Sequence, residues 1–189
     1  MNIGNNPGNG KTGGGVDPDT VTKAIGHPPM EEQYDIRIAR DGTWYHNGDP
    51  IRRLELAKLF ATVLRRDDAG GYWLITPAER GRVVVEDVPF VAVEMTVNGS
   101  GRGRVLSFRT NLDEWVDAGP DHPIRIETHP ETGEPRPYIL IRKGLEARIS
   151  RPVFYELVDQ CEPQAQDREA VVGVWSRNTF FALGELPGA

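Results

Sequence analysis

The chain has a single cysteine, Cys161, among its 189 residues. One thiol cannot form a disulfide within the chain, so no covalent cross-link of this kind stabilises the fold. Cys161 ends the apolar face of a predicted helix, and free cysteine packs as a small hydrophobic side chain. We therefore expect a buried spacer rather than a reactive thiol at this position.

The sequence also lacks a long hydrophobic run. No apolar stretch approaches the roughly 20 residues that a membrane-spanning helix needs, and the N-terminus has no basic segment followed by an apolar one. These absences predict a cytoplasmic protein that does not bind or enter a membrane.

Positive charge is scarce. The 28 acidic residues outnumber the 22 lysines and arginines, for a net charge of −6. General nucleic-acid binding needs a strongly basic face, so the composition argues against it. The cations are 18 arginines and only four lysines, and the planar guanidinium suits carboxylates and phosphates. A local arginine-lined anion site therefore stays open, beside the alternative that the arginine bias reflects genomic composition.

Metal-binding and catalytic signatures are missing as well. His46, His122 and His129 show no His-x-x-His or Cys-x-x-Cys spacing. There is no Gly-x-Ser-x-Gly motif, and Ser150 and Ser176 have no base that the sequence identifies. We expect no metal, no cofactor and no catalytic residue, so the sequence leans away from an enzyme.

Residues 1–33 form a segment rich in Gly, Asn and Pro that cannot bury enough apolar surface to fold, and we predict a flexible tail. Two phosphate-binding patterns occur in it. Gly10-Lys11-Thr12 looks like the end of a P-loop, but Asn5 stands where the first glycine belongs, and Gly8–Gly13 fits Gly-x-Gly-x-x-Gly. Both motifs bind phosphate only between a strand and a helix N-terminus, and neither element is predicted here.

The most informative feature that is present is an internal repeat. Placing Ile51 over Ile149 aligns Arg53 with Arg151. The alignment continues through a predicted helix, pairing Leu56 with Phe154, Leu59 with Leu157, and Phe60 with Val158. A strand with a central tryptophan follows each helix. The chain is thus predicted to hold two strand–strand–helix–strand units with equivalent helices.

Periodicity and turn residues place the individual elements. Helices are predicted over 52–66 and 150–160, and the first should face a sheet with Leu56, Leu59, Phe60, Val63 and Leu64. Residues 111–116 are predicted to form a short helical turn and 162–169 a polar loop. Strands are predicted over 34–39, 43–46, 72–76, 82–86, 90–97, 105–110, 123–128, 135–142, 145–149, 171–176 and 179–183.

These elements predict an α+β fold of two duplicated small domains, each a curled antiparallel sheet with one main helix. The boundary is expected at Ala118-Gly119-Pro120, which gives an N-terminal domain over 34–118 and a C-terminal domain over 119–189. Domains of this size bury a modest share of their surface, so we expect them to pack on each other. Binding sites concentrate at such interfaces.

Several short segments, taken together, resemble the bacterial "domain of unknown function 1285" family. They are Gly42–Arg53, Tyr72–Pro77, Val88–Phe90, Thr110-Asn111 and Ala147–Arg151, within a likeness that covers about residues 34–185. The resemblance implies two α+β domains related by duplication, the second similar to a pleckstrin-homology fold. It also implies a cleft between the domains, a nucleotide-like ligand and a signalling role, with no activity established for the members.

Arg53 and Arg151 are the most informative polar residues, because each is predicted where a strand meets a helix N-terminus that favours anions. The alternative is that each pairs with a local carboxylate such as Asp49 or Glu146. Tryptophans near a strand end are first of all core aromatics, but they can also stack on a base. The predicted ligand-binding residues are Arg53, Thr110, Asn111, Arg142, Arg151, Trp175 and Ser176.

Three functions remain open. The first is a regulatory module that binds a small anionic, nucleotide-like ligand between its domains. The second is a protein-interaction module that uses its C-terminal domain, and the third, with the least support, is a hydrolase of a phosphorylated metabolite. A basic cleft with ordered aromatics favours the first, and a large exposed apolar patch favours the second. A histidine or metal-bound water opposite an anion site favours the third.

Overall fold

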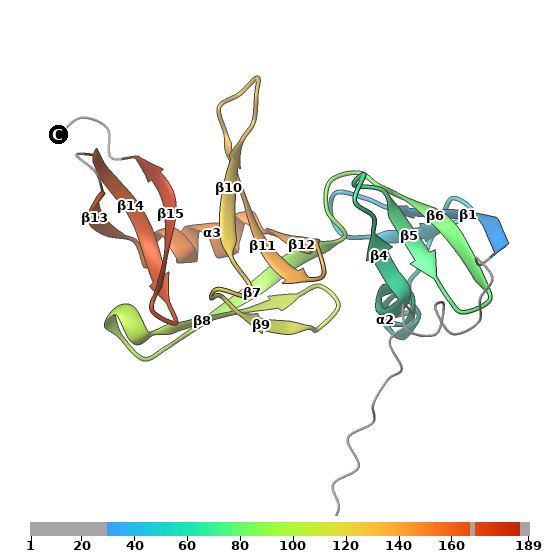
Figure 1. Cartoon of the computed structure of the whole chain (residues 1–189), viewed down its shortest axis with the longest axis horizontal. Helices are drawn as coiled ribbons and strands as arrows, with labels where there is room; N and C mark the ends of the chain where they lie inside the picture. The colour runs from blue at the N-terminus through green and yellow to red at the C-terminus, as the bar shows by residue number, and fades with distance from the viewer. Residues whose placement is uncertain (1–29, 167–168, 186–189) are drawn as a thin grey trace, which may run out of the picture.

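The computed structural model describes residues 30–166 and 169–185. They form three β-sheets, two α-helices and one short 3-10 helix (Figure 1). Most of the tail expected over residues 1–33 lies outside these ranges. No helix within them is long and apolar enough to cross a membrane.

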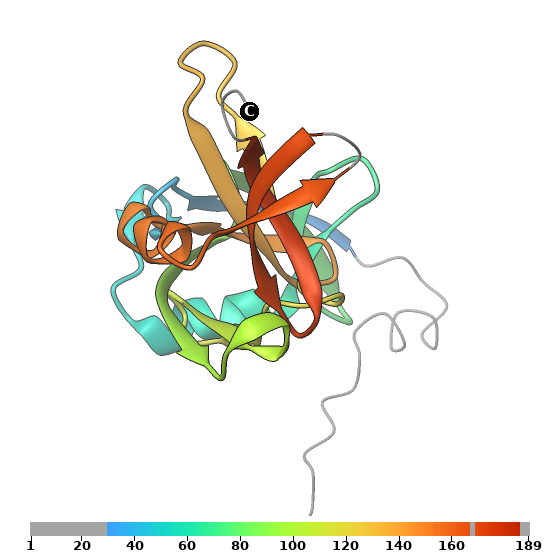
Figure 2. The same ribbon diagram turned by 90° about the vertical axis from the view of Figure 1, so that its left-hand side faces the viewer.

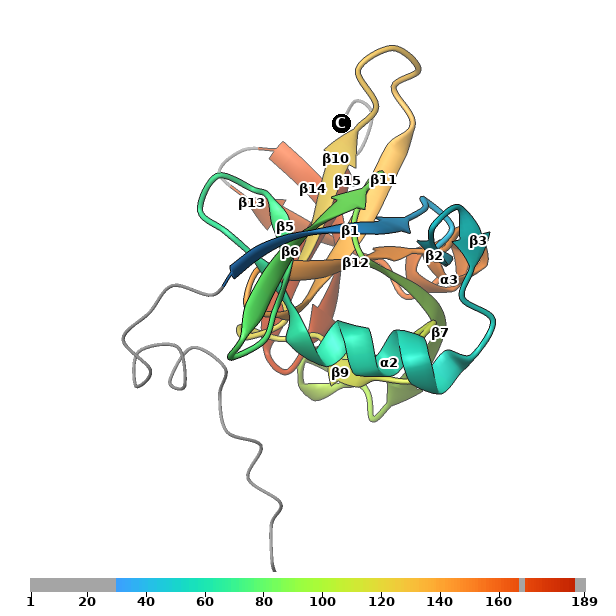
Figure 3. The same ribbon diagram turned by 90° about the vertical axis from the view of Figure 1, so that its right-hand side faces the viewer.

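The first half of the chain builds a curled six-stranded sheet with one helix. The strands are β1 (Met30–Ile38), β2 (Trp44–His46), β3 (Asp49–Pro50), β4 (Leu64–Arg66), β5 (Tyr72–Ile75) and β6 (Glu79–Val85). Their order is β3-β2-β1-β6-β5-β4, and β1 runs parallel to β6 while the other neighbours are antiparallel. Helix α2 (Leu54–Val63) contacts β5 and lies along one side of the sheet (Figure 3).

A second six-stranded sheet follows. Its strands are β7 (Phe90–Asn98), β8 (Val105–Thr110), β9 (Trp115–Asp117), β10 (Ile124–Thr128), β11 (Pro135–Arg142) and β12 (Leu145–Ile149), with the 3-10 helix η1 (Gly101–Gly103) between β7 and β8. The order is β10-β11-β12-β7-β8-β9, and β12 runs parallel to β7. Side chains alternate along β12, where Leu145, Ala147 and Ile149 are buried and the residues between them are not.

The last elements form a helix and a three-stranded sheet. Helix α3 (Arg151–Val158) follows β12 directly. Strands β13 (Glu162–Gln166), β14 (Glu169–Ser176) and β15 (Thr179–Glu185) then form an antiparallel meander, which faces the viewer in Figure 2. The residues expected as a polar loop over 162–169 therefore include strand β13.

The two halves repeat, as the sequence predicts. In each, three strands are followed by a helix and three more strands: β1–β3, α2 and β4–β6, then β10–β12, α3 and β13–β15. Helix α2 contacts β5, and α3 contacts the corresponding strand β14. The first repeat closes by pairing β1 with β6, whereas β10 contacts β15 without joining its sheet. Strands β7–β9 lie between the repeats and extend the second one along β12.

The sheets correct one expectation. Both six-stranded sheets are mixed rather than antiparallel, because β1 pairs with β6 and β7 with β12 across long stretches of chain that local patterns do not report. The boundary expected at Ala118-Gly119-Pro120 lies within the second sheet, since β9 before it and β10 after it belong to that one sheet. A pleckstrin-homology-like fold in the second unit is not confirmed.

Helix α2 buries only part of its expected face, because Phe60 and Val63 pack against the core whereas Leu56 and Leu59 do not. Helix α2 ends at Val63, and Leu64 begins strand β4 by pairing with Leu74. The helix buries Ala57 and Ala61, whereas Leu59 is 60% exposed and Leu56 is 37% exposed. Small alanine side chains let the helix backbone lie close to the sheet, so the leucines turn outward.

Helix α3 buries Val153 and Leu157. The buried pair Ala57 and Ala61 of α2 thus corresponds to Val153 and Leu157, two residues away from the register that places Ile51 over Ile149.

The segment expected as a helical turn over 111–116 is a tight turn followed by strand β9. Asp113 has a φ of 61°, in the left-handed region that a continuing right-handed helix excludes. The backbone N–H of Asp113 donates to the carbonyl of Thr110, which closes the turn.

One apolar core runs through both halves of the chain, and it includes Trp44, Phe90, Leu112 and Leu157.

Candidate functional site

The predicted ligand-binding residues lie in three separate places. Arg53, Thr110, Asn111 and Arg142 lie around α2 and the turn between β8 and β9, where the two halves of the chain meet. Arg151 lies at the start of α3. Trp175 and Ser176 end strand β14 of the third sheet. The structure therefore does not gather all seven into one site.

Asn111 links the two halves directly. Its Oδ1 accepts a hydrogen bond from the Val91 N–H at 3.0 Å, and its Nδ2 donates to the Gly42 carbonyl at 3.0 Å. Gly42 has a φ of 82°, and a Cβ added there would lie 2.6 Å from Asn111 Nδ2. The close contact of Asn111 with the β1–β2 turn therefore requires glycine on the other side.

Thr110 shapes the turn that carries Asn111. It is fully buried, and its hydroxyl accepts hydrogen bonds from the backbone N–H groups of Leu112 and Glu114. Thr110 therefore holds the turn from inside and is not available to a ligand.

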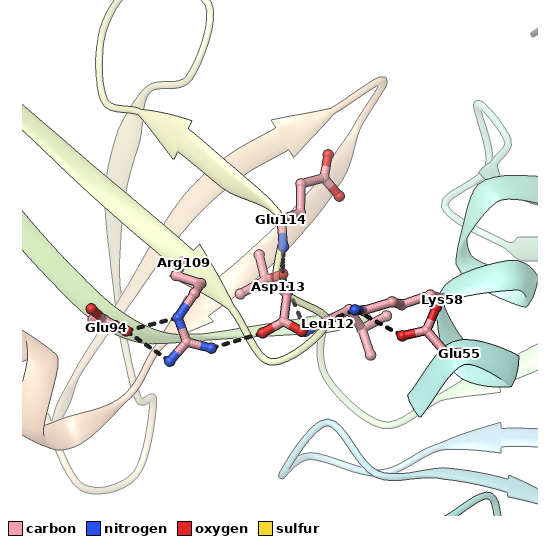
Figure 4. A network of polar contacts seen from close by, with 8 residues as sticks. Glu55, Lys58, Glu94, Arg109, Leu112, Asp113 and Glu114 are labelled. Atoms are coloured by element: carbon pink, nitrogen blue, oxygen red, sulfur yellow. Dashed lines mark hydrogen bonds and ion pairs between the residues drawn. The ribbon is translucent and has the colours of Figure 1, made fainter. Parts of the chain in front are cut away.

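Asp113 at the tip of this turn bonds to Lys58 of α2 at 2.9 Å and to Arg109 at 2.9 Å (Figure 4). The hydrogen bond from Lys58 lowers the pKa of Asp113 below its usual value, and Asp113 in turn raises the pKa of Lys58. This charged contact links the turn to α2 and is the second link between the halves.

Arg142 binds the C-terminal end of α2. Its guanidinium donates to the carbonyl of Ala61 at 2.9 Å, forms an ion pair with Glu114 and lies over the ring of Phe90. A cation at a helix C-terminus is stabilised by the helix dipole and by unpaired carbonyls. Arg142 thus connects the second half of the chain to the last turn of α2.

A fourth contact between the halves involves Asp87, in the segment that joins β6 to β7. Its carboxylate accepts hydrogen bonds from the Tyr138 hydroxyl at 2.9 Å and from Arg148 at 3.0 Å. Burial and the bonded Asp87 raise the pKa of Tyr138 to about 12. The tyrosine therefore stays protonated and keeps this bond at neutral pH.

A small pocket of about 190 Å³ lies between the halves at the start of α2. Its walls come from the first half at Trp44, Arg52 and Leu54 and from the second half at Asn111 and Leu112. Trp44 is only 2% exposed, and its indole N–H has no hydrogen-bond partner among the described residues. The pocket thus combines a cation, an amide side chain and a tryptophan with an unsatisfied donor.

The electrostatics of this pocket favour an anion. Arg53 is the N-cap residue of α2, and no side chain caps the backbone N–H groups of the first turn. Within residues 30–166 and 169–185, neither Arg52 nor Arg53 forms a side-chain hydrogen bond or ion pair. The alternative partners Asp49 and Glu146 do not pair with Arg53, and Glu146 binds Arg125 instead. Two exposed cations therefore flank a helix end that attracts negative charge.

Arg151 has a different environment. It forms an ion pair with Glu134 at 2.9 Å, in which the two side chains are 73% and 59% exposed. The predicted alternative of a carboxylate partner therefore applies to Arg151, although the partner is neither Asp49 nor Glu146. Arg151 also lines a separate cavity of about 400 Å³ in the second repeat.

Trp175 and Ser176 have structural partners. The Ser176 hydroxyl is fully buried, donates to the Ala118 carbonyl at 2.7 Å and accepts from the Leu106 N–H at 3.0 Å. The Arg102 guanidinium lies 4.7 Å from the centre of the Trp175 ring, and Phe180 packs beside it. These contacts tie the third sheet to β8 and to the end of β9.

Other chemistry is sparse in the described part of the chain. It holds no cluster of His, Cys, Asp and Glu that could bind a metal ion. Burial raises the pKa of the Cys161 thiol, which disfavours the reactive thiolate.

Sequence reasoning did not identify Arg52, Lys58 or Asp113 as functional candidates. The register of the repeat draws attention to Arg53 and not to its neighbour. The contact between Lys58 and Asp113 joins residues far apart in the chain, and no local pattern reports it.

Two domain models of one protein family match the two halves of the chain. The model of the "Domain of unknown function (DUF1285), N-terminal domain" matches residues 25–88. That of the "Protein of unknown function (DUF1285), C-terminal domain" matches residues 89–183. The two matches meet between β6 and β7, not at residues 118–120. No curated protein matches the chain.

Two solved structures are similar. A DUF1285 family protein from Silicibacter pomeroyi DSS-3 shares 40% identity at a TM-score of 0.80, with 93% of this chain and 91% of that chain covered. A second, from Shewanella baltica OS155, shares 26% identity at a TM-score of 0.53, with 66% of this chain and 90% of that chain covered.

Proposed function

The chain belongs to the DUF1285 family, and from this premise we propose that it is a regulatory module that binds a small anionic ligand between its halves. The ligand class is a phosphate-bearing molecule of nucleotide or sugar-phosphate type. The observation that carries the proposal is the pair Arg52 and Arg53, which have no partner in the described residues and flank the uncapped start of α2.

The position of the pocket supports a regulatory role. A phosphate at the start of α2 would accept hydrogen bonds from free backbone N–H groups and from Arg52, all of which belong to the first half. The amide of Asn111 would reach the same ligand from the second half. Because Asn111 also bonds to Gly42 and Val91, a ligand that engages it stabilises the junction of the halves.

The pocket volume of about 190 Å³ limits what can be enclosed. A phosphate group fits inside, and the rest of a nucleotide or sugar extends toward solvent past Arg53. We therefore expect recognition of the anionic group with modest selectivity for the remainder of the ligand.

The test is a thermal-shift and calorimetric titration of the full chain with inorganic phosphate, pyrophosphate, AMP and glucose 6-phosphate. A ligand that binds only the folded state raises the apparent Tm in proportion to ln(1 + [L]/Kd). With at least one of these probes we expect a Tm that rises with ligand concentration as this relation requires, and a saturable heat of binding in the calorimetric titration. We also expect the increase to be lost in the double variant Arg52→Ala/Arg53→Ala.

Arg151→Ala is the matched control, because it also removes an exposed arginine at the start of a helix, here α3. It should leave the response unchanged. The proposal is wrong if none of the four probes raises the Tm at millimolar concentration. It is also wrong if the double variant responds as strongly as the parent protein.

A further inference from the structure

The duplication places a notch at the same point in both repeats, where a strand pair ends and a helix begins. In the first repeat, the Ile51 N–H donates to the Trp44 carbonyl at 2.7 Å, just before α2. In the second, the register that pairs Tyr138 with Arg148 places Pro137 opposite Ile149, just before α3. The inter-half pocket lies in the first of these notches and the cavity of about 400 Å³ lies in the second.

The first notch is occupied by another part of the same chain, the turn between β8 and β9. Leu112 of this turn is 8% exposed and joins the core that contains Trp44 and Ala57. The next residue, Asp113, forms its ion pair with Lys58 on the surface of α2 (Figure 4). The turn therefore binds through one leucine and one adjacent carboxylate.

The second notch also has apolar residues at its base, but no turn of the described residues covers them. Buried Ile149 and Pro137 lie at its base, and Phe154 of α3 forms a wall. Strand β11, which carries Pro137, is already paired with β10 on one side and β12 on the other, so an occupant cannot extend the sheet here and must bind through side chains. Tyr155 borders the cavity and is 59% exposed.

The charged residues at the mouth of the second notch are Arg148, Arg151 and Glu134. Arg148 is already bonded to Asp87, whereas Arg151 has only its exposed ion pair with Glu134. Ion pairs between exposed side chains contribute little, at about 0–1 kcal/mol, so a carboxylate from an incoming chain can replace Glu134.

We propose that the second notch is a docking site for a turn of a partner protein that presents a leucine followed by an acidic residue. The occupant shares a leucine and an adjacent carboxylate with the turn that this chain places in its own first notch, but its carboxylate meets a cation at the start of α3 and not one within the helix, as Lys58 is in α2. Its leucine enters the cavity against Pro137, Ile149 and Phe154, and its carboxylate binds Arg151 in place of Glu134. The partner is a separate protein, because the chain's own Leu112 is already buried in the first notch.

The experiment uses a fluorescently labelled peptide with the sequence of residues 109–116, titrated with the full-length protein and followed by anisotropy. We expect saturable binding that weakens with salt. Replacing the peptide's leucine by alanine should weaken it at least tenfold, since burial of a leucine side chain contributes about 1.5–3 kcal/mol. A peptide with asparagine in place of the aspartate should bind about threefold to tenfold more weakly.

Protein variants locate the site. Arg151→Ala and Tyr155→Ala change exposed residues, so both should fold, and both should weaken binding about threefold or more. Arg136→Ala, at a neighbouring arginine of β11 that does not line the cavity, is the matched control and should leave binding unchanged.

Absence of saturable binding up to about 1 mM protein overturns the proposal. Equal weakening in Arg136→Ala overturns it too, because that result indicates charge attraction alone. Unchanged binding in both Arg151→Ala and Tyr155→Ala places the peptide elsewhere. The phosphate titrations test the other notch, so either proposal can fail while the other stands.

Discussion

The two repeats share one order of strands and helix, but the surface next to the start of the helix differs between them. In the first, the β8–β9 turn closes the notch before α2, and two cations remain beside a small pocket. In the second, no described segment enters the notch before α3, and a cavity about twice as large stays open. The insertion of β7–β9 between the repeats accounts for the difference, because that insertion supplies a closing turn to one repeat only. Duplication therefore produces one self-completed site and one open site.

The sharpest way to break this comparison is to test the helix faces. Leu157→Ala should lower the free energy of unfolding by about 3–5 kcal/mol, because Leu157 is fully buried. Leu59→Ala, its partner in the register built on Ile51 and Ile149, should change it by less than about 0.5 kcal/mol, because Leu59 is 60% exposed. Urea denaturation measures both. Equal losses of unfolding free energy in the two variants would instead support the register that places Leu59 over Leu157.

A second test compares the occupants of the two notches. Leu112→Ala should destabilise the protein by about 2–3 kcal/mol, since it empties an apolar site closed by the other half of the chain. Tyr155→Ala, at the edge of the open notch, should stay within about 0.5 kcal/mol of the parent. If Tyr155→Ala costs as much as Leu112→Ala, the second notch is part of the folded core and is not an open surface.

The smallest expected effect is the pH dependence of the Lys58–Asp113 contact. The pKa of Asp113 is lowered in the folded protein, so its stabilising contribution is present above its ordinary pKa, near pH 4, and is lost as the pH falls through the lowered value. The pKa of Lys58 is raised, so its contribution is present below pH 10.5 and is lost as the pH rises beyond that. The contact should therefore be intact across the neutral range.

Asp113→Asn isolates this effect, because asparagine also tolerates the left-handed backbone at this position. The urea midpoints of parent and variant should differ at pH 6 and converge below pH 3. A difference that stays constant across this range would show that the carboxylate charge of Asp113 does not matter to the junction.

The sequence predicts much of the local structure because local patterns encode it. The alternation of Leu145, Ala147 and Ile149 identifies a strand with one buried face, and the strand is where it is expected. The start of α3 at Arg151, next to Pro152, follows from the same kind of local signal.

Pairing between distant segments was the part that could not be predicted. Nothing near β1 indicates that it runs parallel to β6, and nothing near residues 118–120 indicates that β9 and β10 belong to one sheet. The face of α2 was predicted in part: Phe60 and Val63 pack against the core as expected, but the leucines of the helix outweigh Ala57 and Ala61 in any hydrophobic pattern. Only the packing shows that the alanines make the contact.

Only part of the candidate site could be predicted, because local patterns do not report which distant segments lie together in the fold. Arg53 lies at a helix start, as its local pattern indicates, and Asn111 lies at the junction of the halves. Trp175 and Ser176 were grouped with them because they end a strand, yet their side chains hold the third sheet in place. A strand end is visible in a sequence, but its position relative to another domain is not.

Because Leu112 covers the first notch, the order of synthesis on the ribosome determines when this apolar surface is buried. Residues 30–85 contain every strand of the first sheet, but the turn that covers Trp44 and Ile51 is synthesised only after β8. Translation proceeds at about 5–20 residues per second, so the nascent first half exposes this apolar surface for a few seconds. A chaperone that binds exposed apolar segments has that interval in which to act. The second half needs no comparable wait, because β7, the partner of β12, has already been made.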